Sequence, residues 1–130
     1  MVSETELKEA RRRMREMRKN VPHAVAAIYL PRLKRILVTL SDGFEIALDP
    51  ERIQTLENAK PSALKKIEIN AAGYELFFPA LDDGLWVPGL LQGLTGTRKW
   101  MEQAAKRDAR ELARRKKLPG AQPQSSRTAA

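Results

Sequence analysis

Two runs of residues that favour β-strands flank an Asp-Gly step in the first half of the chain. Residues 34–40 are rich in β-branched and apolar side chains, and residues 44–48 alternate apolar and polar ones. An Asp-Gly pair between two such runs favours a tight antiparallel hairpin. Together with the apolar run before Pro31, this pattern predicts an antiparallel meander of three strands at 24–30, 34–41 and 44–48.

Side chains two residues apart in a strand lie on the same face of a sheet. We therefore expect the second and third strands of the meander to share one apolar face. That face would hold Ile36, Val38, Leu40, Phe44, Ile46 and Leu48.

The rest of the middle region predicts short helices and a second hairpin. Asp49, Pro50 and Glu51 have the order of an N-cap, a first helical residue and a first-turn acid, which predicts a two-turn helix at 50–57. Ser62 should cap one further turn. The remaining expected elements are strands at 65–70 and 74–78 around a turn at 71–73, a turn at 82–84 before an extended run at 85–87, and a short helix from Pro88 that Gly93 or Gly96 ends.

Helical patterns occupy both ends of the chain. Ser3 and Glu6 form a capping box at the start of a helix expected over 4–19. A second helix is expected at 97–118, with Thr97 as its N-cap. Runs of strands between helices argue against a doubly wound sheet. The predicted fold is therefore α+β: a small antiparallel sheet of four to six short strands with short helices, flanked by N-terminal and C-terminal basic helices.

The expected organisation has four parts. A chain of 130 residues has the length of a single folded domain. The last twelve residues, 119–130, are mostly Pro, Gly, Gln, Ser and Ala, a composition that cannot bury enough surface to fold. We expect an amphipathic basic helix at 1–20, an α+β domain at 21–96, a basic helix at 97–118 and a disordered tail at 119–130.

One apolar stripe runs along the N-terminal helix. Leu7, Ala10, Met14 and Met17 recur at spacings of three and four residues, which places them on one side. Ala and Met make a thin stripe, and Met side chains adapt to irregular surfaces. The stripe could dock on the protein's own core or on another chain, and pairing with a second copy would give a homodimer.

The net charge of +8 is concentrated at the two ends of the chain. Residues 1–20 hold seven basic and four acidic residues, and residues 96–130 hold ten and three. Residues 21–95 hold seven basic and nine acidic residues. A near-neutral middle between two basic arms indicates contact with a polyanion or an acidic partner. The alternative is that both helices simply carry Arg on a solvated face.

The C-terminal helix carries the most one-sided charge. Its basic residues at 99, 106, 110, 114 and 117 recur at spacings that line one side of a helix. Such an array binds nucleic-acid phosphates with strong salt dependence and without reading sequence. The residues predicted to bind nucleic acid or an acidic partner are Arg98, Lys99, Lys106, Arg107, Arg110, Arg114, Arg115, Lys116 and Lys117.

The residue types that catalysis and metal binding require are scarce. The chain has no Cys, which excludes disulfides, thiolate zinc sites and Cys nucleophiles. Its single histidine, His23, has no nearby carboxylate in the sequence. Ser41 lies in a turn rather than a nucleophile elbow, and Asp82 and Asp83 supply too few oxygens for a calcium loop. We therefore expect no enzyme, no metal and no cofactor.

The segment 93–99 has glycines before a helix start and basic residues after it. A helix N-terminus attracts anions, and the G-x-x-G spacing is similar to the loop that holds nucleic-acid backbone in KH modules. The segment does not meet the P-loop pattern. A tight turn with glycines at positive φ is therefore the favoured interpretation.

Composition also bears on location. The sequence has no apolar run long enough to span a membrane, and its N-terminus has mixed charge without the apolar region of a secretory signal. We expect no membrane partner and a cytoplasmic protein.

Three segments carry the motifs of the middle region: RILVTLSDGFEIALDP, IEINAAGYELFFPALDDGLWVPGLLQG and GTRKWM. Along these segments the expected elements follow in the order strand, Asp-Gly turn, strand, short helix, and a second pair of strands ending in Phe78-Pro79. In this order, and in its leucine-rich segment 87–91, the chain from about Val25 to Trp100 resembles a family of small bacterial proteins known only as a domain of unknown function.

The resemblance implies a small α+β domain, and it identifies no catalytic residues that could be carried over to this chain. Some members carry a C-terminal helix-turn-helix domain, and others are encoded beside toxin-like small proteins and are suspected antitoxins. This chain departs from the helix-turn-helix type, because its C-terminal block is one basic helix and a tail. That departure argues against sequence-specific reading of DNA.

Residues and resemblance together lead to one functional prediction. We expect a non-enzymatic binding module, antitoxin-like or regulatory, whose folded middle recognises a toxin-like protein partner. Its basic C-terminal helix would contact nucleic acid or an acidic surface. The alternative is a protein–protein interaction or oligomerisation module that binds no nucleic acid.

Overall fold

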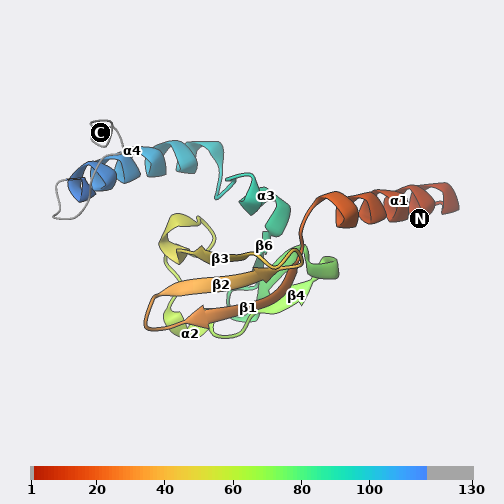
Figure 1. The fold of residues 1–130 in the computed structure, drawn as a ribbon, viewed down its shortest axis with the longest axis horizontal. Helices are drawn as coiled ribbons and strands as arrows, with labels where there is room; N and C mark the ends of the chain where they lie inside the picture. Colours follow the sequence, from red (N-terminus) through yellow and green to blue (C-terminus); the bar gives the residue numbers. More distant parts are fainter. Residues whose placement is uncertain (1, 117–130) are drawn as a thin grey trace, which may run out of the picture. The chain divides into compact units, whose positions relative to one another are not determined.

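The computed structural model describes residues 2–116, so Lys117 and the tail expected at 119–130 lie outside the described residues. Figure 1 shows the described elements coloured along the sequence, from red at the N-terminus to blue at the C-terminus. The chain divides into two units, with the boundary between Thr95 and Gly96. The described strands all belong to the first unit. Strands and helices together confirm the predicted α+β class.

The first sheet is the predicted meander. Its strands β1 (Ala24–Leu30), β2 (Arg35–Leu40) and β3 (Glu45–Leu48) lie in the order β1-β2-β3 and pair antiparallel (Figure 1). Between β2 and β3 the chain turns at Ser41, Asp42 and Gly43, and Gly43 has a φ of +91. A φ in this range favours glycine, which explains the strength of the Asp-Gly signal.

The shared apolar face is confirmed at five of its six positions. Ile36, Val38 and Leu40 are buried, and Ile46 and Leu48 are partly buried against the same core. Register explains this, because Ile36 pairs with Leu48 and Val38 pairs with Ile46. Phe44 is the exception, since its side chain is 73% exposed. It follows directly after the turn, before β3 begins.

The second sheet contains β4 (Glu68–Asn70), β5 (Glu75–Phe78) and β6 (Asp83–Trp86), again antiparallel in chain order. The four to six strands expected in one sheet are thus six strands divided over two sheets. The turn expected at 82–84 lies earlier, because Asp82 takes a left-handed φ of 48 at the end of the short helix η3 (Pro79–Leu81). Asp83 and Gly84 therefore already belong to β6.

The connecting helices are shorter than expected. The helix predicted at 50–57 is only η1 (Pro50–Arg52), although Asp49 caps it by accepting a hydrogen bond from the backbone N–H of Glu51. Ile53 takes extended dihedral angles, which end the helix and place this residue in the core. The helix α2 (Pro61–Leu64) has Lys60 at its N-cap, so the prediction that Ser62 caps this turn is wrong.

Both sheets and their connections contribute to one core. Ile36 and Val38 from the first sheet and Leu76 and Phe78 from the second are at most 1% exposed. The hydrophobic effect contributes about 1.5–3 kcal/mol for each such side chain removed from water. The cluster is completed by Ala24, Tyr29, Leu40, Ile53, Leu56, Leu64, Leu85 and Val87.

The turn η2 (Ala71–Gly73) connects β4 to β5 in a strained conformation. Ala71, Ala72 and Gly73 all have positive φ, of 50, 57 and 96. A Cβ atom on Gly73 would lie 2.6 Å from the carbonyl oxygen of Ala24. Only glycine fits this close approach between the two sheets.

Three further helices complete the structure. Helix α1 (Glu4–Asn20) begins with the predicted capping box of Ser3 and Glu6. Helix α3 (Val87–Leu91) follows β6 directly and is succeeded by Gly93 at a φ of +84. Helix α4 (Arg98–Arg115) forms the described part of the second unit, and the side chain of Thr97 caps it as predicted.

Candidate nucleic-acid interface

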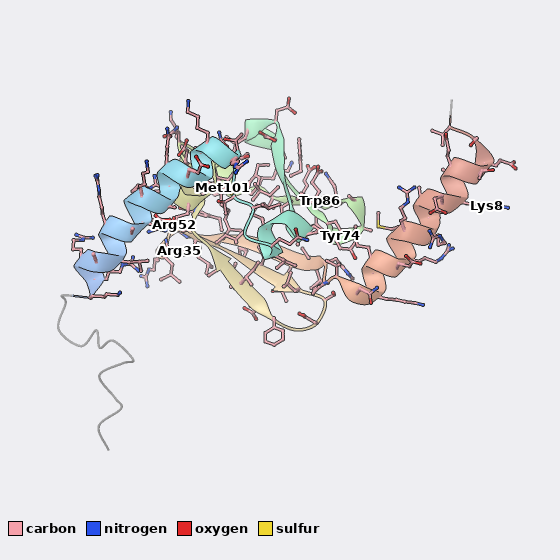
Figure 2. The ribbon with its side chains drawn as sticks, turned by 90° about the horizontal axis from the view of Figure 1, so that it is seen from above. Lys8, Arg35, Arg52, Tyr74, Trp86 and Met101 are labelled. Carbon is pink, nitrogen blue, oxygen red and sulfur yellow. The ribbon has the colours of Figure 1, made fainter. Side chains whose placement is uncertain are left out.

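Helix α4 presents a row of basic side chains that have no ion-pair partner among the described residues. Lys99, Lys106, Arg110 and Arg114 are exposed. Within residues 2–116, none of the four has a carboxylate within ion-pair distance. Lys106, Arg110 and Arg114 line one open depression of the helix surface together with Gln103, Arg107 and Glu111. Figure 2 shows nitrogen-tipped side chains spread along α4.

Three other predicted basic residues of α4 are paired with carboxylates. Arg98 lies 3.6 Å from Glu102, Arg107 lies 3.8 Å from Asp108, and Arg115 lies 2.9 Å from Glu111. These pairs are largely exposed, so each contributes at most about 1 kcal/mol. They neutralise part of the charge at those positions. Lys116 follows the last helical residue, and Lys117 lies outside the described residues.

The structure thus divides the predicted basic set into two groups. The unpaired row (Lys99, Lys106, Arg110 and Arg114) keeps its full charge available to an anion. The distance from 106 to 114 along a helix axis is about 12 Å. Duplex DNA carries about seven phosphate charges over that length. The unpaired row therefore fits a phosphate backbone better than a single small anion.

Helix α1 leaves its apolar stripe uncovered. It contains no buried residue: Leu7 is 45% exposed, Ala10 is exposed, and Met14 and Met17 are only half-buried. Of the two alternatives for this stripe, docking on the protein's own core is therefore not observed. The stripe is open to another chain.

The ion pairs of α1 join side chains of the same helix that are three or four residues apart. Arg12 bridges two carboxylates, since it donates to Glu9 and, over 2.8 Å, to Glu16. The hydrogen bond from Arg12 lowers the pKa of Glu9 below its ordinary value, and the charges of Arg12 and Arg13 act in the same direction. Much of the acidic charge of α1 is thus held by its own arginines.

His23 lies in a packed row of rings. Its ring is 5.8 Å from that of buried Tyr74, and Tyr74 is 6.0 Å from Trp86. Figure 2 shows Tyr74 and Trp86 near each other in the first unit. The hydroxyl of Tyr74 donates to the carbonyl of Val21 over 3.1 Å. This row connects the segment after α1 to the second sheet.

Both ring nitrogens of His23 have unusual surroundings. Arg18 approaches Nε2 over 3.4 Å. Because a guanidinium can only donate, Nε2 is the acceptor in this contact. Nδ1 is buried and finds no partner among the described residues. The ring therefore lacks the carboxylate partner of a catalytic dyad.

The other candidate motifs also have structural roles. Asp83 accepts a hydrogen bond from the backbone N–H of Gly84 over 2.8 Å. Ser41 accepts one from the backbone N–H of His23 over 3.1 Å. In the part of the chain that the structure describes, no three His, Asp or Glu side chains are grouped to hold a metal ion. Over the same residues, no helix is both long and apolar enough to cross a membrane.

Two exposed aromatic residues were not predicted from the sequence, which placed Phe44 on the shared apolar face and assigned no exposed role to Trp86. Phe44 is 73% exposed and Trp86 is 49% exposed, whereas Tyr29, Tyr74 and Phe78 are buried. Alternation could have indicated Trp86, because buried Leu85 and Val87 flank it. Nothing in the sequence distinguishes Phe44 from its apolar neighbours of the same parity.

A family profile described as "Protein of unknown function (DUF2442)" matches residues 24–96, which is more than half of the chain. The chain belongs to this family. The match confirms the predicted resemblance and covers both sheets with their connecting helices. Helices α1 and α4 lie outside it. No curated protein gives a significant match to the sequence.

Two solved structures are similar to this chain. A crystal structure of a protein of unknown function from Rhodospirillum rubrum has 39% identity and a TM-score of 0.60, and the match covers 63% of this chain and 99% of the other. An NMR structure of an uncharacterised protein from Chromobacterium violaceum has 29% identity and a TM-score of 0.63, with 79% and 94% covered. Both support the fold, and neither description states a function.

Proposed function

We propose that this protein is a non-enzymatic binding module whose helix α4 contacts the phosphate backbone of nucleic acid. The observation that carries the proposal is the unpaired row, whose four basic side chains have no carboxylate partner among the described residues. Lys and Arg side chains held in this way release counterions when they meet phosphates. Such contacts position a protein on nucleic acid without reading sequence.

Salt dependence gives this proposal a quantitative form. Each neutralised phosphate contributes about −0.9 to the slope of log affinity against log salt on duplex DNA. Four contacts from the unpaired row therefore predict affinity about 100-fold weaker at 200 mM than at 50 mM salt. A protein that binds only through one residual contact would lose about threefold over the same range.

The experiment titrates a fluorescent DNA duplex of arbitrary sequence with the full chain at both salt concentrations. Lys106→Gln, Arg110→Gln and Arg114→Gln are combined in one variant, and the salt slope should fall by about 0.9 for each lost contact. The matched control combines Arg98→Gln, Arg107→Gln and Arg115→Gln, which removes the same charge from the ion-paired positions. The proposal fails if the wild-type protein does not bind the duplex at 50 mM salt. It also fails if the two variants lose affinity equally and their salt slopes fall equally.

Two observations support the non-enzymatic part of the proposal. His23 places one ring nitrogen against a guanidinium and buries the other, so neither nitrogen is set to exchange a proton with a substrate. Asp83 and Ser41 are engaged in backbone hydrogen bonds. A turnover that is abolished by Asp83→Asn would overturn this part.

A second candidate function is recognition of a protein partner without nucleic acid. The exposed stripe of α1 favours it, because Leu7, Met14 and Met17 offer apolar surface that the protein's own core does not cover. An antitoxin-like or regulatory role, with a toxin-like protein as partner, would use such a surface. Co-expression with the product of the adjacent gene tests it, since a stable complex should form and should be lost in Met14→Glu.

A further inference from the structure

The stripe of α1 has the spacing of a helix-pairing seam. Leu7, Ala10, Met14 and Met17 follow intervals of three, four and three residues, which are the a and d positions of a heptad repeat. The helix is 17 residues long, or about 26 Å. Its four seam residues therefore cover most of one side, and none of them is buried.

The charges of α1 are separated along its axis. Residues 4–10 hold three Glu and one Lys, whereas residues 11–20 hold six Arg or Lys and one Glu. The first half is thus acidic and the second half strongly basic. A partner that covers the seam therefore meets negative charge beside residues 4–10 and positive charge beside residues 11–20.

We propose that α1 pairs antiparallel with α1 of a second copy of this chain. In that orientation residues 4–10 of each helix, with three Glu and one Lys, face residues 14–20 of the other, with three basic residues and one Glu. The arginines at 11–13 meet their own copies at the centre of the pair, and the two helix dipoles oppose each other favourably. In a parallel pair the two basic halves would lie together and repel. Charge complementarity thus selects both the occupant and its direction.

The seam also fixes a register. In an antiparallel pair, a positions of one helix meet d positions of the other. Leu7 then packs on Met17 of the second copy, and Ala10 packs on Met14 of the second copy. The two inner layers each combine a small residue with a long flexible one, which Met accommodates well.

Helix α4 does not offer the same arrangement. Its residues 98–106 hold three basic residues and one acidic, and residues 107–116 hold five and two. Both halves are positive, so two copies of α4 repel in either direction. Self-association through α1 is consequently independent of nucleic-acid binding by α4, and either proposal can fail without the other.

Single-cysteine cross-linking tests direction and register, and the absence of native Cys leaves no competing thiol. Full-length Leu7→Cys and Met17→Cys proteins, one of them with an affinity tag, are oxidised alone and as a mixture. The mixed disulfide should form at least about tenfold faster than the Leu7→Cys homodimer, because pairing raises the effective concentration of the two thiols. In the proposed pair the two Leu7 positions are about 15 Å apart, too far for a disulfide.

A sedimentation experiment tests the pairing itself. Wild-type protein should show a monomer–dimer equilibrium, and Met14→Glu should weaken it at least about tenfold, because a charge would be buried in the seam. Arg15→Glu, on a solvated face, is the matched control for introducing the same side chain into α1. Circular dichroism confirms that each variant stays folded.

Three results would overturn the proposal. They are a wild-type protein that remains monomeric at every concentration, a Leu7→Cys homodimer that forms faster than the mixed disulfide, and a dimer that Met14→Glu leaves intact.

Discussion

The middle of the chain and its two terminal helices differ in how they are stabilised. Every buried side chain of the described residues lies between positions 24 and 88, whereas α1 and α4 bury none. The middle holds two more acidic than basic residues, so the net charge of +8 comes from the two ends. The family match covers this middle, residues 24–96. The buried core therefore lies within the family domain, and the excess positive charge lies in the segments that flank it.

The flanking helices also differ from each other despite similar composition. Helix α1 separates acidic from basic residues along its axis and ties Glu9 and Glu16 to Arg12. Helix α4 is basic along its whole length and leaves the unpaired row open. Arrangement, more than total charge, thus distinguishes the two helices.

The largest expected effect contrasts the core with a flanking helix. Phe78 is 0% exposed at the centre of the core, and Phe78→Ala should lower the free energy of unfolding by about 3–5 kcal/mol. Met14→Ala removes a side chain of α1 and should change it by no more than about 0.5 kcal/mol. Urea denaturation at low protein concentration measures both. Equal losses of unfolding free energy in the two variants would show that α1 belongs to the cooperative core, contrary to the contrast between the buried middle of the chain and α1.

A smaller effect is expected at the junction of the two sheets. Gly73→Ala adds a Cβ atom that would lie 2.6 Å from the carbonyl oxygen of Ala24, at a φ that disfavours Ala. The expected loss is about 1–3 kcal/mol. Gly43→Ala is the matched control: it has a similar φ, but nothing lies within 4 Å of its Cβ position. If both variants lose the same stability, the backbone conformation alone sets the cost and the sheet contact contributes nothing.

Local patterns predicted the parts of the fold that local chemistry decides. The capping box at Ser3, the Asp49 cap and the turn at Gly43 each depend on residues close in sequence, and each is present. The helix expected at 50–57 stops after Arg52, where Ile53 takes extended dihedral angles, and both Ile53 and Leu56 are still buried in the core. Division of the strands into two sheets likewise depends on distant contacts.

For the candidate interface, the sequence predicted which residues are basic but not which remain unpaired. Spacing placed positions 106, 110 and 114 on one side of α4. Arg115 reaches Glu111 while Arg114 has no carboxylate partner among the described residues, and this difference depends on side-chain geometry. The exposure of the α1 stripe was also open in the sequence, because an apolar stripe looks the same whether it covers its own core or another chain.

The smallest expected effect compares two helix caps. Asp49 caps η1 and lies 3.7 Å from Arg35 and 3.5 Å from Arg52, so Asp49→Ala should lower the free energy of unfolding by about 1 kcal/mol; both arginines are labelled in Figure 2. Ser3→Ala removes an equivalent cap from α1, but unfolding of the core should not change, since α1 buries nothing in it. Amide hydrogen exchange distinguishes the two cases: the N–H of Glu6 should exchange faster in Ser3→Ala while the amides of β2 keep their protection. Loss of protection in β2 would mean that α1 and the core unfold together.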